Sequence, residues 1–261
     1  MYNIFDVSLG NHCFIILQLE EEKMFLNKLV KKYASRCGIS IQRKNAFINF
    51  NYRYAEHFLY FNRCFGMIRK LDGDIVECGV ALGRSLMMFA FLVKDSGGGR
   101  HLYGFDSFEG FPEPSFEDRD DSPESRKRNV QKGQNKTPLN IAWQLLLNNL
   151  TDMRGNRDEQ FTNKHITLIK GYFNQTLINY PGKQIALLHI DCDLYEGYLT
   201  VLETLYHRVV KGGLILFDEY DVKAFPGAAK AVDCFFDKID DSDYKFVYDE
   251  TISKYYVVKM K

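Results

Sequence analysis

The sequence of 261 residues predicts an α/β protein built on a mostly parallel β-sheet. From Asp74 onward, short apolar runs rich in β-branched residues alternate with helix-like segments, which is the pattern of a parallel sheet covered by helices on both faces. The composition, 46% hydrophobic and 26% charged, is that of an ordinary globular protein. Two strand-like runs end the chain and predict a hairpin at the edge of the sheet.

Residues 1–71 are expected to form a helical N-terminal extension that caps the rest of the chain. Within Glu21 to Tyr33 and within Ala55 to Ile68, apolar residues recur at intervals of three and four positions, as on one face of a helix. These faces could pack on the sheet or form the contact of a homodimer.

Residues 72–261 are expected to form the main domain. Its strands are predicted at Asp74 to Val80, His101 to Phe105, His165 to Lys170, Gln184 to Asp191 and Gly213 to Asp218, with the hairpin at Tyr244 to Tyr248 and Tyr255 to Lys259. Helices are predicted at Arg84 to Lys94, Leu139 to Asn149, Glu196 to Val209 and Ala228 to Ile239.

An insertion of about fifty residues, 112–163, separates the second and third predicted strands. Its first half is polar, with clustered charges from Glu117 to Arg128, and is interpreted as loop. A long insertion within a compact domain is typical of a lid or a binding loop, although a solvated loop without a role is the alternative.

The first strand of the main domain runs into a glycine-containing turn and then a helix. Glu77, Gly79 and Gly83 form the pattern E-x-G-x-x-x-G at this turn. Glycines allow a ligand to approach the backbone closely, and the N-terminus of the following helix favours an acidic group. Arg84 and Ser85 open that helix and could meet the carboxylate of a cofactor.

The second predicted strand ends in Asp106 and Ser107, where an acidic side chain can bind the two hydroxyls of a ribose. The glycine spacing is not the G-x-G-x-x-G of nicotinamide enzymes. We therefore expect a cofactor that contains adenosine, with capping of a loop by Asp106 as the alternative. Phe173, after the third strand, could flank the adenine or simply pack.

Four acidic residues follow the next two predicted strands. Asp191 and Asp193 come directly after one of them, and Asp218 and Glu219 come after the other. Because parallel strands place their carboxyl ends along one edge, these side chains should converge on the crevice where α/β proteins bind ligands. Converging carboxylates predict a divalent cation, and oxygen ligands favour Mg, Ca or Mn over Zn.

Three neighbouring side chains are weaker candidates. Tyr195 and Tyr220 adjoin the acidic residues and could orient a carboxylate or line a substrate pocket. His189 lies within an apolar run and is expected to face a neighbouring helix.

The run from Asp74 to about Val232 resembles the macrocin O-methyltransferase family. The matching segments are Glu77 to Val80, Tyr103 to Pro112, Lys170 to Phe173, Asp191 to Glu196, and Asp218 to Tyr220 followed by Pro226 and Gly227. The resemblance implies a Rossmann-like class I methyltransferase fold whose seventh strand is antiparallel to its neighbours. It also implies that S-adenosylmethionine is the cofactor and that a sugar hydroxyl of an antibiotic or related glycoside is methylated.

With that cofactor, the residues expected to contact it are Glu77, Gly79, Gly83, Arg84, Ser85, Asp106, Ser107, Phe173 and Asp191. The resemblance further implies a metal site and a base. Mg²⁺ would be bound by Asp191 together with Asp218 and Glu219, and Asp193 would act as the base. Glu219 is longer than the aspartate usual in the family, so its direct contact with the metal is an open point.

The expected reaction is a metal-assisted O-methylation. A sugar hydroxyl is a weak acid and aspartate a weak base, so a bound divalent ion would have to lower the pKa of the hydroxyl. The alternatives are an N-methyltransferase for an amino sugar, a protein that binds S-adenosylmethionine without catalysis, and, less favoured, a nicotinamide-dependent oxidoreductase. The acceptor could be an antibiotic glycoside, a nucleotide sugar or a precursor of a surface glycan.

The charge balance argues against some partners. With 34 basic and 34 acidic residues the formal net charge is zero, so neither a nucleic-acid nor a membrane partner is expected. The six cysteines show no metal-ligand spacing, and no apolar run approaches the length of a membrane span. A cytoplasmic location with reduced thiols is expected.

Overall fold

The computed structural model describes residues 3–9, 13–19, 40–43, 51–120, 122–152 and 154–261. The chain divides into two compact units, residues 1–47 and residues 48–261. Each unit is described by itself.

The first unit contains a three-stranded antiparallel sheet. Its strands are β1 (Asn3–Leu9), β2 (Cys13–Leu19) and β3 (Ser40–Arg43), in the order β2-β1-β3. We expected helices throughout residues 1–71, and these three segments correct that expectation. Phe5, Val7 and Leu9 alternate with polar residues, and a period of two belongs to a strand. The helix expected at residues 21–33 lies outside the described residues.

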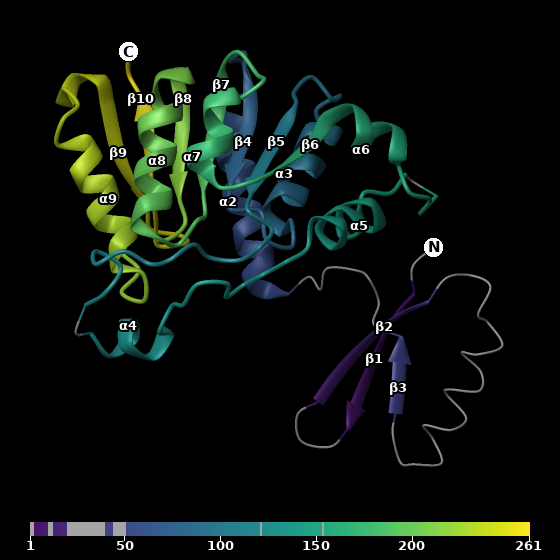
Figure 1. Cartoon of the computed structure of the whole chain (residues 1–261). Helices are drawn as coiled ribbons and strands as arrows, with labels where there is room; N and C mark the ends of the chain where they lie inside the picture. Colours follow the sequence, from purple (N-terminus) through teal and green to yellow (C-terminus); the bar gives the residue numbers. More distant parts are fainter. Residues whose placement is uncertain (1–2, 10–12, 20–39, 44–50, 121, 153) are drawn as a thin grey trace. The chain divides into compact units, whose positions relative to one another are not determined.

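The second unit contains a seven-stranded sheet in the order β6-β5-β4-β7-β8-β10-β9 (Figure 1). The first five of these strands are parallel, whereas β10 is antiparallel to both β8 and β9. This arrangement confirms the predicted fold, including the terminal hairpin and the antiparallel last strand. The strands are β4 (Asp74–Cys78), β5 (Leu102–Asp106), β6 (Ile166–Lys170), β7 (Ile185–Ile190), β8 (Val209–Phe217), β9 (Tyr244–Asp249) and β10 (Lys254–Lys259).

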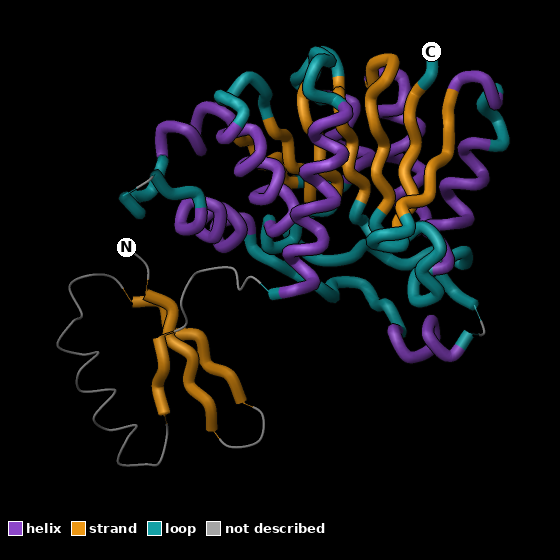
Figure 2. Tube along the Cα trace, turned by 180° about the vertical axis from the view of Figure 1, so that it is seen from behind, coloured by secondary structure: helices purple, strands orange, loops and turns teal. Residues whose placement is uncertain are grey.

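Helices cover both faces of this sheet. Figure 1 shows α8 and α9 in front of the strands, and Figure 2, seen from behind, shows the helices of the other face. One core cluster joins α2 and α3 to the sheet, and a second joins α8 and α9 to it. The α-helices are α2 (Tyr52–Met67), α3 (Arg84–Asp95), α4 (Pro123–Arg128), α5 (Leu139–Asn149), α6 (Glu159–His165), α7 (Phe173–Thr176), α8 (Tyr195–Leu205) and α9 (Pro226–Phe236), and the 3-10 helices are η2 (Leu177–Asn179), η3 (Tyr206–Arg208) and η4 (Asp241–Asp243).

The insertion between β5 and β6 is more ordered than its composition suggested. Helix α4 lies in the part that we interpreted as loop, and it carries ordinary helix-end signals. The Ser122 hydroxyl caps its N-terminus, Pro123 occupies the first turn, and Asn129 ends it in a left-handed conformation. The helix was not predicted because six residues are too few to show a hydrophobic periodicity, and the segment is rich in charged residues.

Helix α2 belongs to the same compact unit as the large sheet, although the expected domain boundary lay after residue 71. Phe61 is buried between α2 and the sheet, with its ring centroid 4.4 Å from that of Phe89 and 5.2 Å from that of His189. The Arg100 guanidinium, just before β5, donates hydrogen bonds to the carbonyl oxygens of Ile68, Leu71 and Gly73. These contacts fix the end of α2 against the start of the sheet.

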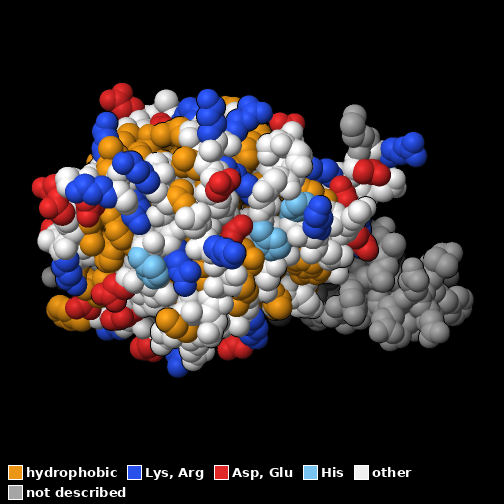
Figure 3. Space-filling model, turned by 90° about the horizontal axis from the view of Figure 1, so that it is seen from above, with side chains coloured by type: hydrophobic (Ala, Val, Ile, Leu, Met, Phe, Trp, Pro, Cys, Tyr) orange, Lys and Arg blue, Asp and Glu red, His pale blue; other side chains and the backbone are white. Residues whose placement is uncertain are grey.

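No helix among the described residues combines the length and hydropathy that crossing a membrane requires. On the face seen in Figure 3, basic and acidic side chains are mixed together, as a net charge of zero allows.

Replacing Phe61 tests whether α2 is part of the folded core. Phe61→Ala should lower the free energy of unfolding by about 3–5 kcal/mol because it leaves a cavity between α2 and the sheet. Leu59→Ala, on the exposed side of the same helix, should change it by less than about 0.5 kcal/mol. Urea denaturation followed by circular dichroism measures both, and equal small effects would contradict the inclusion of α2 in this unit.

Candidate functional site

The carboxyl ends of β4, β5, β7 and β8 border a cavity of about 870 Å³. Strand β4 lies between β5 and β7. The strand that follows β4 in sequence, β5, therefore lies on one side of it, and the later strands β7 and β8 lie on the other. A crevice of this kind is the usual ligand site of open α/β sheets. Nine predicted site residues line the cavity: Gly79, Arg84, Asp106, Ser107, Phe173, Asp191, Asp193, Asp218 and Glu219.

The turn after β4 requires glycine for a steric reason. Gly79 has a φ of 98°, and a Cβ atom at this position would lie 1.7 Å from the carbonyl oxygen of Asp191. Any larger residue would therefore separate the ends of β4 and β7. The glycine keeps the two ends in contact beneath the cavity.

Asp106, at the end of β5, holds the same turn from the other side. Its Oδ2 atom accepts hydrogen bonds from the backbone amides of Val80 (2.9 Å) and Ala81 (2.8 Å), and its Oδ1 atom accepts one from Phe108 (2.7 Å). Asp106 thus caps a loop, which was the alternative interpretation, while its carboxylate also lines the cavity. The two roles are compatible because a carboxylate has about four acceptor positions.

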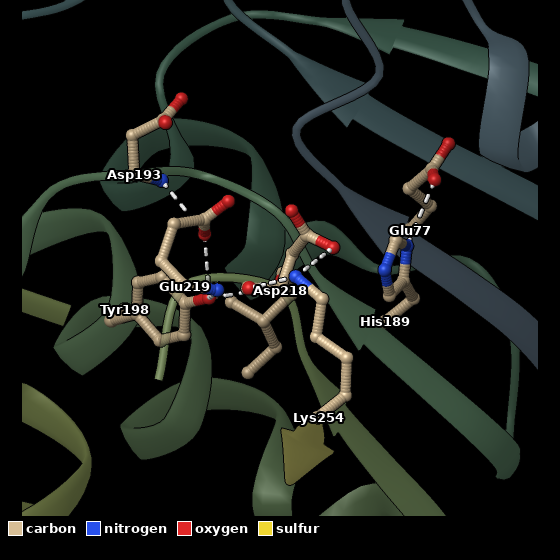
Figure 4. A network of polar contacts seen from close by, with 8 residues as sticks. Glu77, His189, Asp193, Tyr198, Asp218, Glu219 and Lys254 are labelled. Carbon is tan, nitrogen blue, oxygen red and sulfur yellow. Dashed lines mark hydrogen bonds and ion pairs between the residues drawn. The ribbon is translucent and has the colours of Figure 1, made fainter. Parts of the chain in front are cut away.

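Three predicted cofactor residues do not line the cavity: Glu77, Gly83 and Ser85. Glu77 is buried, and its Oε1 atom lies 3.0 Å from Nδ1 of the buried His189 (Figure 4). Burial lowers the pKa of His189, but Glu77 together with Asp191 and Asp218 raises it by more, so the pKa lies above its ordinary value. His189 also packs against Phe61 and Phe89, in agreement with the expectation that it faces helices.

The acidic residues after β7 and β8 converge as the sequence predicts. Asp191, Asp218 and Glu219 each offer a carboxylate oxygen, and these oxygens lie within 4.8 Å of one another. The backbone amide of Asp218 donates to the carbonyl of Ile190 at 3.0 Å, which aligns the two strand ends. Asp193 follows in a left-handed turn with a φ of 64°, and its amide donates to Oε2 of Glu219 at 3.3 Å.

Tyr198 of α8 orients Glu219. The tyrosine oxygen lies 2.7 Å from Oε2 of Glu219 and 2.9 Å from the carbonyl oxygen of Ile190, and it accepts the backbone amide of Glu219 at 3.0 Å. These contacts engage only one oxygen of Glu219, as Figure 4 shows. Oε1 is therefore the atom through which Glu219 could reach a cation directly. Tyr195 and Tyr220 were the expected candidates for this orienting role, and neither residue lines the cavity.

Lys254, the first residue of β10, brings a positive charge to the acidic residues. Its ammonium group lies 2.9 Å from Oδ1 of Asp218 and also donates to the backbone carbonyl of Asp218. Burial alone would raise the pKa of Asp218, but the charges of Lys254 and His189 outweigh it and lower that pKa to about 2. Asp218 is therefore ionised at neutral pH.

The other carboxyl groups are harder to ionise. Burial, reinforced by the charge of Asp218, raises the pKa of Asp191 well above its ordinary value. Burial and the neighbouring Asp191 and Asp218 do the same to Glu219. Burial raises the pKa of Asp193 to about 7, although Arg128 in the insertion opposes that rise. A group with a pKa near neutrality in a cavity is suited to proton transfer.

This donor set fits a divalent cation. Asp218 is ionised, and its charge helps to raise the pKa values of Asp191 and Glu219, so a doubly positive ion would relieve the repulsion among the three carboxylates. An all-oxygen donor set suits Mg²⁺. The rest of the cavity fits an adenosyl cofactor, because a glycine turn, the acid Asp106 and the aromatic Phe173 line one side.

Sequence reasoning identified Arg84 but missed three other basic side chains at the site. Arg53 at the start of α2 and Lys132 in the insertion both line it, and Lys254 reaches the acidic residues from the terminal hairpin. Arg53 and Lys132 stand in segments without a motif. A lysine at the start of a strand gives no local signal of a contact 36 residues away.

Comparison with known proteins identifies the family of the chain. The sequence pattern of the macrocin-O-methyltransferase (TylF) family matches residues 61–242. The chain is 32% identical over 155 residues, 59% of its length, to an 8-demethyl-8-(2,3-dimethoxy-alpha-L-rhamnosyl)-tetracenomycin-C 4'-O-methyltransferase of Streptomyces olivaceus. It is 29% identical over 175 residues, 66% of its length, to a demethyldecarbamoylnovobiocin O-methyltransferase of Streptomyces niveus. The matches span 55% and 62% of the lengths of these two relatives.

Among solved structures, the calicheamicin methyltransferase CalS11 superposes with a TM-score of 0.65 at 22% sequence identity, covering 96% of this chain and 98% of that one. This likeness supports the class I methyltransferase fold. The chain belongs to the macrocin-O-methyltransferase family.

Removing one carboxylate from the acidic residues tests the metal site. Asp191→Asn should weaken Mg²⁺ or Mn²⁺ binding by at least about tenfold, since even indirect partners of metal ligands contribute that much. Without metal, the variant should unfold at the same temperature or a higher one, because an amide at position 191 cannot repel Asp218. Calorimetric titration and thermal unfolding measure the two effects.

Asp221→Asn is the matched control, because Asp221 is exposed and lies two residues after Glu219. It should leave metal binding unchanged. Equal affinities for wild type and Asp191→Asn would rule out the proposed ligand set.

Proposed function

We propose that this protein is an S-adenosylmethionine-dependent O-methyltransferase that methylates a hydroxyl group of a sugar with the help of Mg²⁺. The observation that carries the proposal is the meeting of Asp191, Asp218 and Glu219 beside a cavity that also contains Asp106, within a chain of this family. The two relatives named above are O-methyltransferases, which supports methylation of a hydroxyl group, and the name of the first includes a rhamnosyl group.

The cofactor half of the cavity supports S-adenosylmethionine. We assign the ribose hydroxyls to Asp106, whose carboxylate the turn amides already hold in place. Arg84 lies with its guanidinium 4.9 Å from the ring centre of Tyr54, and we assign it to the cofactor's carboxylate. Glu77, Gly83 and Ser85 do not border the cavity, so we assign them to shaping its wall from behind.

The part of the cavity beside the acidic residues must bind the sugar acceptor, orient its hydroxyl group and provide a base. Asp193 is the proposed base, because it lines the cavity and its raised pKa makes it a better proton acceptor than an ordinary aspartate. Asp191 and Asp218, with Glu219, are the proposed ligands of Mg²⁺. When bound, the ion would supply the acidity that a sugar hydroxyl lacks.

A methyl-transfer assay tests the proposal. Purified protein with S-adenosylmethionine, Mg²⁺ and a panel of nucleotide sugars and glycosides should release S-adenosylhomocysteine with at least one acceptor. EDTA should abolish the reaction and added Mg²⁺ should restore it. Full activity after rigorous chelation and in Asp191→Asn would refute the metal-assisted mechanism, and turnover with amino sugars alone would indicate N-methylation instead.

The pH dependence tests Asp193 as the base. The base acts in its ionised form, so kcat should rise with pH as Asp193 loses its proton. Its pKa of about 7 is that of the metal-free protein, and a bound divalent cation should move the midpoint below that value. Asp193→Asn should remove this rising limb together with most of kcat, while the dissociation constant of S-adenosylhomocysteine stays within about twofold of wild type.

A wild-type profile without a rising limb at any pH at which the protein stays folded would contradict the assignment of Asp193 as the base.

A further inference from the structure

Helix α8 begins without a cap from its own neighbourhood. Its N-cap residue is Leu194, and no side chain at that position accepts a hydrogen bond from the first turn. The missing acceptor comes from the insertion: Oδ1 of Asp118 accepts the backbone amide of Tyr195 at 2.7 Å, across 77 positions of sequence. A carboxylate at this position satisfies an amide that has no partner within the helix and interacts favourably with the helix dipole.

Asp118 is itself firmly held. It is 8% exposed, and its Oδ2 atom accepts hydrogen bonds from both the backbone amide (2.8 Å) and the hydroxyl (2.9 Å) of Ser115. A Cβ atom on Gly227, at the start of α9, would come within 2.0 Å of Oδ1. Lys230 of α9 donates to the carbonyl oxygen of Glu117 at 2.7 Å. Residues 115–118 are thus packed against the beginnings of both α8 and α9.

The contact lies next to the candidate catalytic turn. Tyr195 is two residues after Asp193, and the only residue between them, Leu194, is 2% exposed. The insertion also contributes Pro112, Glu113 and Lys132 to the cavity wall. Asp118 therefore connects two walls of the cavity, the insertion on one side and the turn that follows β7 on the other.

We propose that Asp118 is a positioning residue for methyl transfer. It fixes the insertion to the first turn of α8. It thereby fixes the position of Asp193 relative to the part of the cavity wall that the insertion forms. This inference rests on the proposed function, because it assumes that the Asp191 to Asp193 turn is catalytic. Asp118 does not line the cavity and acts through Tyr195 and the backbone of the turn.

Hydrogen exchange tests the contact without any need for activity. In Asp118→Ala, peptides that cover residues 191–198 should exchange about fivefold faster or more, which is the change expected on losing a helix cap. Asp120→Ala is the matched control. Asp120 lies in the same insertion and likewise accepts an amide (2.9 Å) and a hydroxyl (2.6 Å), both from Ser122, but it is exposed. This control should leave residues 191–198 unchanged.

Kinetics test the positioning role. Asp118→Ala should lower kcat and raise the KM of the acceptor, each by about fivefold or more, while S-adenosylhomocysteine binding stays within about twofold. Asp118→Asn keeps one acceptor oxygen for Tyr195 and should recover part of both losses, and it also serves if Asp118→Ala does not fold. A purely structural role would instead reduce the fraction of active protein and leave the KM of the acceptor unchanged.

The outcomes separate this inference from the function that it rests on. Unchanged exchange in residues 191–198, equal effects of the Asp118 and Asp120 variants, or faster exchange with unaltered kinetics would each overturn the role of Asp118. A wild-type protein that transfers no methyl group to any acceptor would refute the proposed function. The exchange experiment would then still decide whether Asp118 holds the turn.

Discussion

Repulsion among buried carboxylates is the constraint on which the candidate site depends. Asp191, Asp218 and Glu219 lie within reach of one ion, and burial makes their negative charges expensive to maintain. The order of strands β4, β7 and β8 forces this proximity, because the acids follow directly where parallel strands end. The site is therefore prepared for a compensating positive charge by the topology of the sheet.

The protein relieves part of that repulsion with side chains from distant elements. Lys254 keeps Asp218 ionised, and Tyr198 with the amide of Asp193 holds one oxygen of Glu219. Asp193 lies just outside this group and titrates near neutrality. Neighbouring carboxyl groups thus acquire different pKa values from their surroundings: that of Asp218 is lowered, those of Asp191 and Glu219 are raised well above the ordinary value, and that of Asp193 is raised to about 7.

The sequence predicted the parts of this arrangement that are local along the chain. The order of strands and helices follows from apolar periodicity, and Asp191, Asp218 and Glu219 follow from their position after apolar strands. Contacts that join remote segments gave no such signal: Tyr198, Lys254 and Asp118 meet their partners across 21, 36 and 77 positions. The three N-terminal strands were not predicted. The helix-like spacing of apolar residues in residues 21–33 was taken to hold for the whole N-terminal segment, although apolar and polar residues alternate in residues 5–9, as in a strand.

The place of β10 in the sheet has a consequence for biosynthesis. This strand follows β9 along the chain, yet in the sheet it lies between β8 and β9. As the ribosome delivers the polypeptide from its amino end, Asp191, Asp218 and Glu219 emerge before Lys254 does. During that interval the nascent chain carries its acids without their lysine counter-charge, so the pairing of β10 with β8 brings Lys254 to Asp218.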